Sequence, residues 1–110
     1  SYPMTAVFGI PHGMACVLTL GEMLEFNSAA NGEKLLALCR VMDCSDVREA
    51  KQKIGSILKD LRIKTRLRDY GLKKGDLALI LDKGFTPERM VNNPGKVTKG
   101  DLQKILERIY

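Results

Sequence analysis

The chain has 110 residues, of which 45% are hydrophobic and 28% charged, an ordinary composition for a folded protein that argues against disorder. The length predicts one domain, residues 1–110. A chain of this length is small for an enzyme that must also bind a dinucleotide. The formal net charge of +5 is concentrated between Lys59 and Lys74, where seven basic residues face only Asp60 and Asp69.

Helical periodicity dominates the sequence from His12 onward. Before it, Thr5–Ile10 is mildly β-prone, but it is short and bracketed by Pro3 and Pro11, so we predict no strand. The next segment, Gly13–Phe26, is apolar on almost all sides, which is typical of a buried helix. Two interpretations remain open: a central helix of a small bundle, or a helix that packs against a further domain.

Two amphipathic helices are predicted next. The first covers Leu35–Met42 and follows Asn31-Gly32, which supplies a cap and a break. The second begins with Asp46 and Glu49 at capping-box spacing, and Ser45 is an alternative cap. We expect its apolar stripe to face the same core as the preceding apolar helix. The stripe consists of Val47, Ala50, Ile54, Ile57, Leu58 and Leu61.

Two further helices are predicted in the C-terminal part. A shorter one covers Asp76–Lys83 and is stopped by Gly84, and a Pro-containing loop spans residues 92–95. Thr98 and Asp101 have capping-box spacing at the start of the last helix. Its apolar face is formed by Leu102, Ile105, Leu106 and Ile109. The whole pattern predicts an all-α domain.

The cellular setting is predicted from what the chain carries. Its apolar run Met14–Leu20 is far shorter than the roughly 20 residues of a membrane span, so we expect no membrane. It begins without an initiator Met or a secretory signal, so we expect a part of a longer protein. The three cysteines, Cys16, Cys39 and Cys44, are odd in number and lack C-x-x-C spacing. The first two fall on apolar stretches, where free cysteine acts as a small hydrophobic residue, and a cytoplasmic location fits best.

His12 is the only histidine, and it lies directly before the apolar helix. The partial positive charge of a helix N-terminus disfavours a protonated imidazole and so favours a metal ligand or a base. The alternative, which the sequence alone favours, is a histidine that caps the helix and hydrogen-bonds locally. No spacing of the remaining residues completes a zinc site, and no nucleotide-binding or hydrolase motif is present.

Residues 8–16, which read FGIPHGMAC, resemble the P-H-G-x-A segment of the iron-containing alcohol dehydrogenases. Residues 18–27 resemble the next stretch of that family, with Gly21 in place of the usual proline. Residues 67–71 resemble its Leu-x-(Asp/Glu)-x-Gly turn, and residues 93–110 resemble its Asn-Pro-Arg segment and closing helix, with Gly95 where Arg is common. The opening residues 1–6 are most similar to the phosphonoacetaldehyde reductase-like branch.

The resemblance implies the C-terminal helical-bundle domain of the iron-containing alcohol dehydrogenase (dehydroquinate synthase-like) fold, without its N-terminal nucleotide-binding domain. His12 would then be the last of four metal ligands, an Asp and three His, for Fe²⁺ or Zn²⁺. The full-length enzyme would use NAD or NADP on an alcohol or aldehyde substrate, and no catalytic residue besides the metal ligand is implied. The isolated chain is expected to be inactive.

Two other functions remain open. The first is a basic helical binding module for nucleic acid or acidic partners. Its basic residues would be Lys59, Arg62, Lys64, Arg66, Arg68, Lys73 and Lys74. The segment has one aromatic residue and no recognised DNA-binding motif, so we expect no nucleic acid partner. The second is an interaction fragment that associates with its own N-terminal domain, or with copies of itself, through uncovered apolar surface.

Overall fold

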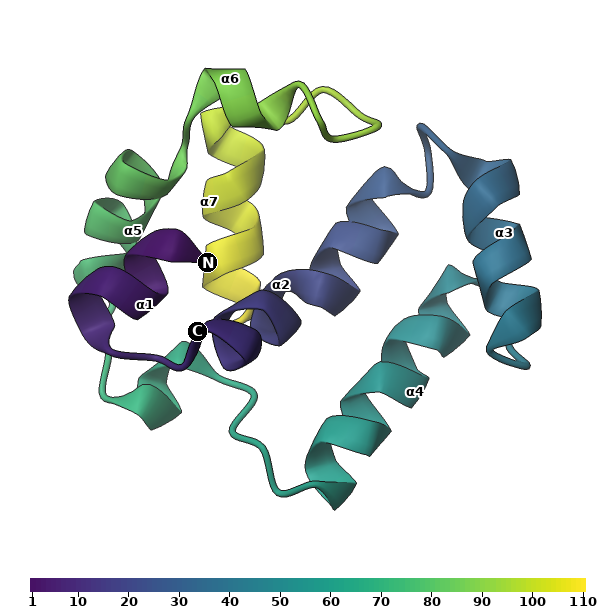
Figure 1. Cartoon of the computed structure of the whole chain (residues 1–110), viewed down its shortest axis with the longest axis horizontal. Coiled ribbons are helices and arrows are strands. Elements are labelled where there is room, and N and C mark those ends of the chain that lie inside the picture. The colour runs from purple at the N-terminus through teal and green to yellow at the C-terminus, as the bar shows by residue number, and fades with distance from the viewer.

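The computed structural model describes residues 1–110, and every regular element in it is helical (Figure 1), which confirms the all-α prediction. None of the helices combines the length and the apolar composition that a bilayer crossing requires. In chain order the elements are α1 (Tyr2–Phe8), α2 (His12–Asn27), α3 (Gly32–Val41), α4 (Val47–Asp60), the short 3-10 helix η1 (Leu67–Tyr70), α5 (Asp76–Gly84), α6 (Pro87–Met90) and α7 (Lys99–Arg108).

Helix α1 includes residues 5–8 of the mildly β-prone stretch Thr5–Ile10, where no strand was predicted but no helix was predicted either. Pro3 lies in the first turn, where its missing N–H costs the helix nothing. Gly9 ends the helix in the left-handed conformation with φ 66°, and the N–H of Ile10 then donates to the carbonyl of Met4. The proline that precedes the β-prone stretch in the sequence therefore lies in the first turn of a helix.

The predicted helix caps are largely present. Asp46 Oδ1 accepts a hydrogen bond from the N–H of Glu49 at 2.8 Å, and Ser45 N–H donates to Glu49 Oε2 at 2.6 Å. Helix α7 has the complete capping box between Thr98 and Asp101. Both helices therefore begin where local side-chain chemistry predicts. Helix α3 also begins after Asn31, although the Asn31 side chain makes no capping bond.

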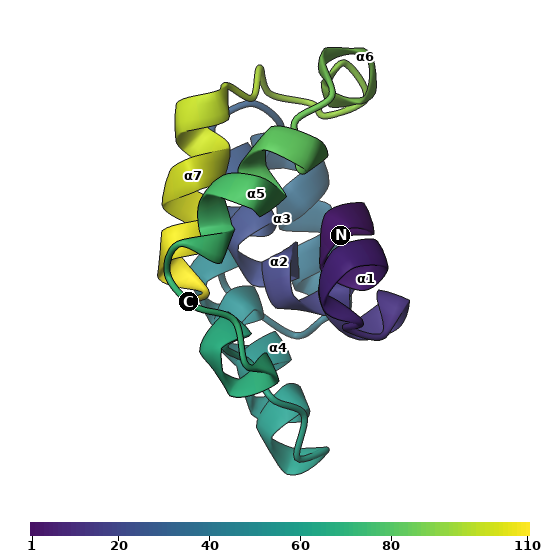
Figure 2. The ribbon, with the colours of Figure 1, turned by 90° about the vertical axis from the view of Figure 1, so that its left-hand side faces the viewer.

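The main core lies between α1, α2, η1, α5 and α7, which gather on one side of the molecule (Figures 1 and 2). Helices α1 and α2 pack together, α5 packs on α1 and α7, and α7 also packs on α2. The buried side chains of this core are Met4, Ile10, Ala15, Leu18, Leu67, Leu72, Leu77, Ile80, Leu81, Leu106 and Ile109.

Helices α3 and α4 form a hairpin on the other side of α2 (Figure 1). The hairpin has its own small core of Cys39, Cys44 and Ala50. The prediction that the α4 stripe faces the main core is right only in part. Helix α4 packs on α2, and Ile54 and Leu58 line a cleft with the core residues Leu18 and Ile109. No residue of α4 is buried in the main core, however, and Leu61 is 64% exposed. Helical periodicity identifies residues that share a face, but it does not identify the neighbour that covers that face.

Helix α2 is only partly covered by the rest of the chain. Ala15 and Leu18 are buried, whereas Leu20 is 42% exposed and Cys16 is also exposed. The interpretation of α2 as a fully enclosed central helix is therefore wrong for this chain. Its packing against a further domain remains a prediction.

Candidate functional site

His12 is the first residue of α2, and its side chain is exposed. Pro11 occupies the N-cap position in an extended conformation, with φ −52° and ψ 135°, and α2 has no side-chain cap. His12 therefore does not cap the helix, but the local hydrogen bond of the alternative interpretation is present, between the His12 imidazole and the Cys16 thiol. The His12 imidazole is exposed at the start of a helix whose next turn is anchored in the main core by Ala15.

The side chain nearest to the imidazole is that of Cys16, one helical turn further along α2. The distance between His12 Nε2 and Cys16 Sγ is 3.6 Å, and both residues are exposed. The prediction that Cys16 acts as a small hydrophobic core residue is wrong, although it is right for Cys39, which is buried. The signal that could have revealed the pair is the spacing of four residues, which places two side chains on one helix face.

This chain alone does not supply a complete metal centre. No group of three or more His, Cys, Asp or Glu side chains lies close enough together to hold an ion. The exposed His12 imidazole fits one position of a multi-ligand site, since nothing in this chain covers it. Any further donors to a four-ligand site would have to come from outside the chain.

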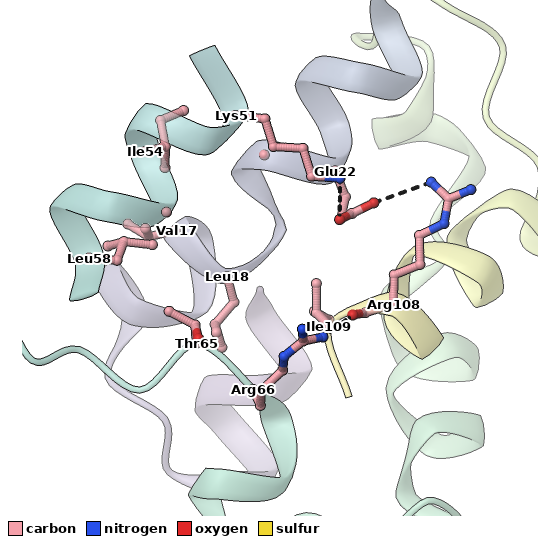
Figure 3. A pocket seen from close by; sticks show the side chains of 12 residues that line it. Val17, Leu18, Glu22, Lys51, Ile54, Leu58, Thr65, Arg66, Arg108 and Ile109 are labelled. Atoms are coloured by element: carbon pink, nitrogen blue, oxygen red, sulfur yellow. Dashed lines mark hydrogen bonds and ion pairs between the residues drawn. The ribbon is translucent and has the colours of Figure 1, made fainter. Parts of the chain in front are cut away.

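A second feature is a cleft of about 230 Å³ between α2, α4 and α7 (Figure 3). One wall of the cleft is apolar, and the charged residues Glu22, Lys51 and Arg108 lie at the opposite end of the cleft. Glu22 Oε1 lies 2.6 Å from Lys51 Nζ, and Glu22 Oε2 lies 3.2 Å from Arg108 Nη1. The Glu22 side chain is only 11% exposed, so this carboxylate joins all three helices at a partly desolvated point.

Lys51 also binds Glu25, at a distance of 2.7 Å. Burial opposes the charge on Lys51, but its hydrogen bonds to Glu22 and Glu25 outweigh this effect and raise the lysine pKa. The hydrogen bond from Lys51 lowers the pKa of the Glu25 carboxyl. Since every charged group of this cluster has a partner, the cluster connects helices and offers no free base or nucleophile.

The basic residues between Lys59 and Lys74 do not share one helix. They lie on the end of α4, the following loop, η1 and the turn before α5. Two of them are engaged within the chain: Lys64 Nζ lies 5.7 Å from the centre of the Tyr70 ring, and Arg66 donates to the carbonyl of Arg108. No recognition helix emerges from this arrangement.

Comparison with known proteins agrees with the resemblance of residues 8–16. The family model described as "Fe-containing alcohol dehydrogenase family, C-terminal" matches residues 1–110. A sulfoacetaldehyde reductase from Bilophila wadsworthia is 28% identical over 109 residues, which cover 89% of this chain and 28% of that protein. It agrees with the predicted phosphonoacetaldehyde reductase-like branch.

Two other relatives are similar over 96% of this chain and 30% of their own length. They are a lactaldehyde reductase from Escherichia coli K12, 25% identical, and an NADPH-dependent butanol dehydrogenase from Clostridium saccharobutylicum, 26% identical. The chain thus spans less than a third of the length of these relatives. No solved structure matches it.

Proposed function

Because the chain belongs to the Fe-containing alcohol dehydrogenase family, as its C-terminal domain, we propose that it is the metal-binding helical part of a nicotinamide-dependent oxidoreductase. The complete enzyme would interconvert a primary alcohol and its aldehyde. The names of three relatives support this reaction class, since they refer to sulfoacetaldehyde, lactaldehyde and butanol. One of those names specifies NADPH, and the proposal covers NAD or NADP.

The observation that carries the proposal is the exposed imidazole of His12 at the start of α2. Within this chain, His12 would hold the metal, Fe²⁺ or Zn²⁺. A bound divalent metal would polarise the substrate oxygen as a Lewis acid. The contribution of the chain is rigidity: Pro11 fixes the backbone before His12, and Ala15 and Leu18 anchor α2 in the main core. The fixed backbone at Pro11 and the packing of α2 in the main core both restrict where the imidazole can lie.

The remaining parts of the proposal concern what lies outside the chain. The nucleotide-binding domain and the other metal ligands would belong to an N-terminal part of the same protein. The uncovered apolar surface of α2, including Leu20, supports contact with that part or with a second copy. The three cysteines are free thiols, which fits the proposed cytoplasmic location.

Replacement of His12 in the complete enzyme tests the proposal. We expect His12→Asn to lower the metal content and to reduce turnover by more than about tenfold. Loss of a group outside the ligand shell alone costs about 10- to 100-fold in metal affinity or activity. Dinucleotide binding should survive, because it would belong to the N-terminal part. His12→Ala should behave in the same way. Wild-type metal content and turnover in His12→Asn would overturn the assignment.

A second measurement concerns the chain by itself. One exposed imidazole does not complete a catalytic centre, so the purified 110-residue chain should show no alcohol-dependent reduction of NAD or NADP. The same assay on the complete enzyme provides the positive control. Turnover by the isolated chain would contradict the proposal that the nucleotide-binding domain and the other metal ligands belong to an N-terminal part of the protein.

A further inference from the structure

From the backbone at the end of α3 we infer that Cys39 and Cys44 form an oxidisable dithiol, whose disulfide would lock the end of that helix. Both residues carry free thiols, and both are buried in the small core of the α3–α4 hairpin. The dithiol involves neither His12 nor a metal, so it stands or falls separately from the proposed function.

The first argument is the way in which α3 ends. The N–H of Cys44 donates to the carbonyl of Cys39 at 2.8 Å. The N–H of Asp43 donates to the carbonyl of Arg40 at 3.1 Å, and Asp43 is left-handed with a φ of 51°. Together these two hydrogen bonds form the Schellman motif, in which the side chain after the left-handed residue often contacts the last turn of the helix. Cys44 and Cys39 occupy the two contacting positions.

The second argument is the distance between the two cysteines, which the same hydrogen bond limits. With standard covalent geometry, a 2.8 Å bond from the Cys44 N–H to the Cys39 carbonyl holds the two Cα atoms within about 6.7 Å of each other. Disulfides span Cα separations of about 4.4–6.8 Å. Both side chains also belong to one buried cluster, which they share with Ala50 of α4. A disulfide therefore requires little movement of the backbone.

The third argument concerns access to the two thiols. Burial raises the pKa of the Cys44 thiol, so little of the reactive thiolate forms near neutral pH while the hairpin is folded. Cys44 Sγ also donates to the carbonyl of Met42 at 3.4 Å. The hairpin core has only three buried residues, so partial unfolding of the hairpin exposes both thiols while the main core stays folded. Oxidation should therefore be slow and should depend on how often the hairpin unfolds.

The oxidant is a low-molecular-weight disulfide, with oxidised glutathione as the probe. The thiolate of one cysteine attacks a glutathione sulfur, which forms a mixed disulfide and releases one glutathione as its thiolate. The other cysteine then attacks the protein sulfur of the mixed disulfide, which forms the Cys39–Cys44 bond and releases the second glutathione. The two protein thiols lose two electrons and two protons in total, and the two released glutathione molecules take them up.

The disulfide should stiffen the hairpin. It closes a loop of six residues, from Cys39 to Cys44, and so restricts the unfolded forms of this segment. Fast peroxide sensors use exposed thiols of low pKa, whereas these thiols are buried and the pKa of Cys44 is raised. The dithiol therefore suits a slow response to lasting oxidation of the glutathione pool, in which the oxidised hairpin unfolds less often than the reduced one.

Trypsin gives a direct readout, because it cleaves after Arg40, between the two cysteines. The complete enzyme is incubated overnight with oxidised glutathione, its remaining thiols are blocked with N-ethylmaleimide, and the monomer band of a non-reducing gel is digested. Residues 35–40 and residues 41–48 should appear as one joined peptide, lighter by two hydrogens than the separate peptides, and dithiothreitol should separate them. Exposed Cys16 should carry only glutathione, which shows that the oxidant was active.

The rate at which trypsin cuts the folded enzyme after Arg40 tests the effect on the hairpin. Oxidation should lower this rate by about tenfold, whereas cleavage after Arg62, in the loop beyond α4, should be unchanged. Cys44→Ala removes one of the two thiols and should show neither the joined peptide nor the slower cleavage. Glutathione on Cys16 without a joined peptide, or a joined peptide without slower cleavage after Arg40, would overturn the inference.

Discussion

The carboxamides of Asn27 and Asn93 form a reciprocal pair across 66 residues of sequence. Asn27 Nδ2 donates to Asn93 Oδ1 at 2.9 Å, and Asn93 Nδ2 donates to Asn27 Oδ1 at 2.6 Å. Asn93 Nδ2 also donates to the carbonyl of Gly95 at 2.7 Å. The pair fastens the loop before α7 to the last residue of α2, and both side chains are partly buried.

Removal of this pair should destabilise the chain. In Asn93→Ala the Asn27 carboxamide and the Gly95 carbonyl lose their partners in a partly buried place, which costs about 1–3 kcal/mol of unfolding free energy. Urea unfolding measures the loss. Asn92→Ala, at the exposed neighbouring position, should stay within about 0.5 kcal/mol of wild type. Equal losses in the two variants would show that the pair contributes nothing.

Gly21 and Gly55 offer a matched test of helix packing. A Cβ atom at Gly21 would lie 3.0 Å from Lys51 Cγ, whereas a Cβ at Gly55 would meet nothing within 4 Å. Gly55→Ala should therefore stabilise the chain by about 0.5–1 kcal/mol, since alanine is the better helix former. Gly21→Ala should gain less, because Lys51 must shift away from Glu22 and Glu25. Thermal unfolding of both variants checks this, and an equal gain would refute the close approach of Lys51.

The α7 capping box should make stability depend on pH. Asp101 Oδ2 accepts hydrogen bonds from the Thr98 hydroxyl at 2.6 Å and the Thr98 N–H at 3.0 Å, and these bonds lower the pKa of the Asp101 carboxyl. A lowered folded-state pKa adds stability that is present above the ordinary carboxyl value of about 4 and is lost as the pH falls through the folded value.

The destabilisation caused by Asp101→Asn should therefore be larger at about pH 7 than at about pH 3. Urea unfolding at the two pH values measures this difference. Thr98→Ser keeps both hydrogen bonds to the carboxylate and should follow the wild type across the same range. If Asp101→Asn caused the same loss at both pH values, the carboxylate charge would have no part in the cap.

Features that depend on neighbouring residues could be predicted from the sequence. The starts of α4 and α7 follow from Asp46 and Thr98, because a cap requires only the next three residues. Helix α1 was not predicted, because a proline within a helix interrupts it. Pro3 does not interrupt α1, since it lies in the first turn of that helix. The burial of α2 and α4 was misjudged, because burial depends on which distant elements pack against each face.

The candidate site shows the same division. His12 could be proposed as a metal ligand from its position before a helix and from the resemblance of residues 8–16, and this assignment stays a prediction. Cys16 was assigned to the interior because its neighbours in sequence are apolar. Only the orientation of α2 in the structure shows that this side chain lies outside and next to the imidazole.

The separation of the main core from the core of the α3–α4 hairpin implies two regions that open with different free energies. The hairpin core has only Cys39, Cys44 and Ala50, so α3 and α4 should exchange their amide hydrogens through local opening well before α2, α5 and α7 do. His12 lies on the slowly exchanging side, since α2 is anchored by Ala15 and Leu18. Fluctuations of the hairpin would therefore leave the imidazole in place.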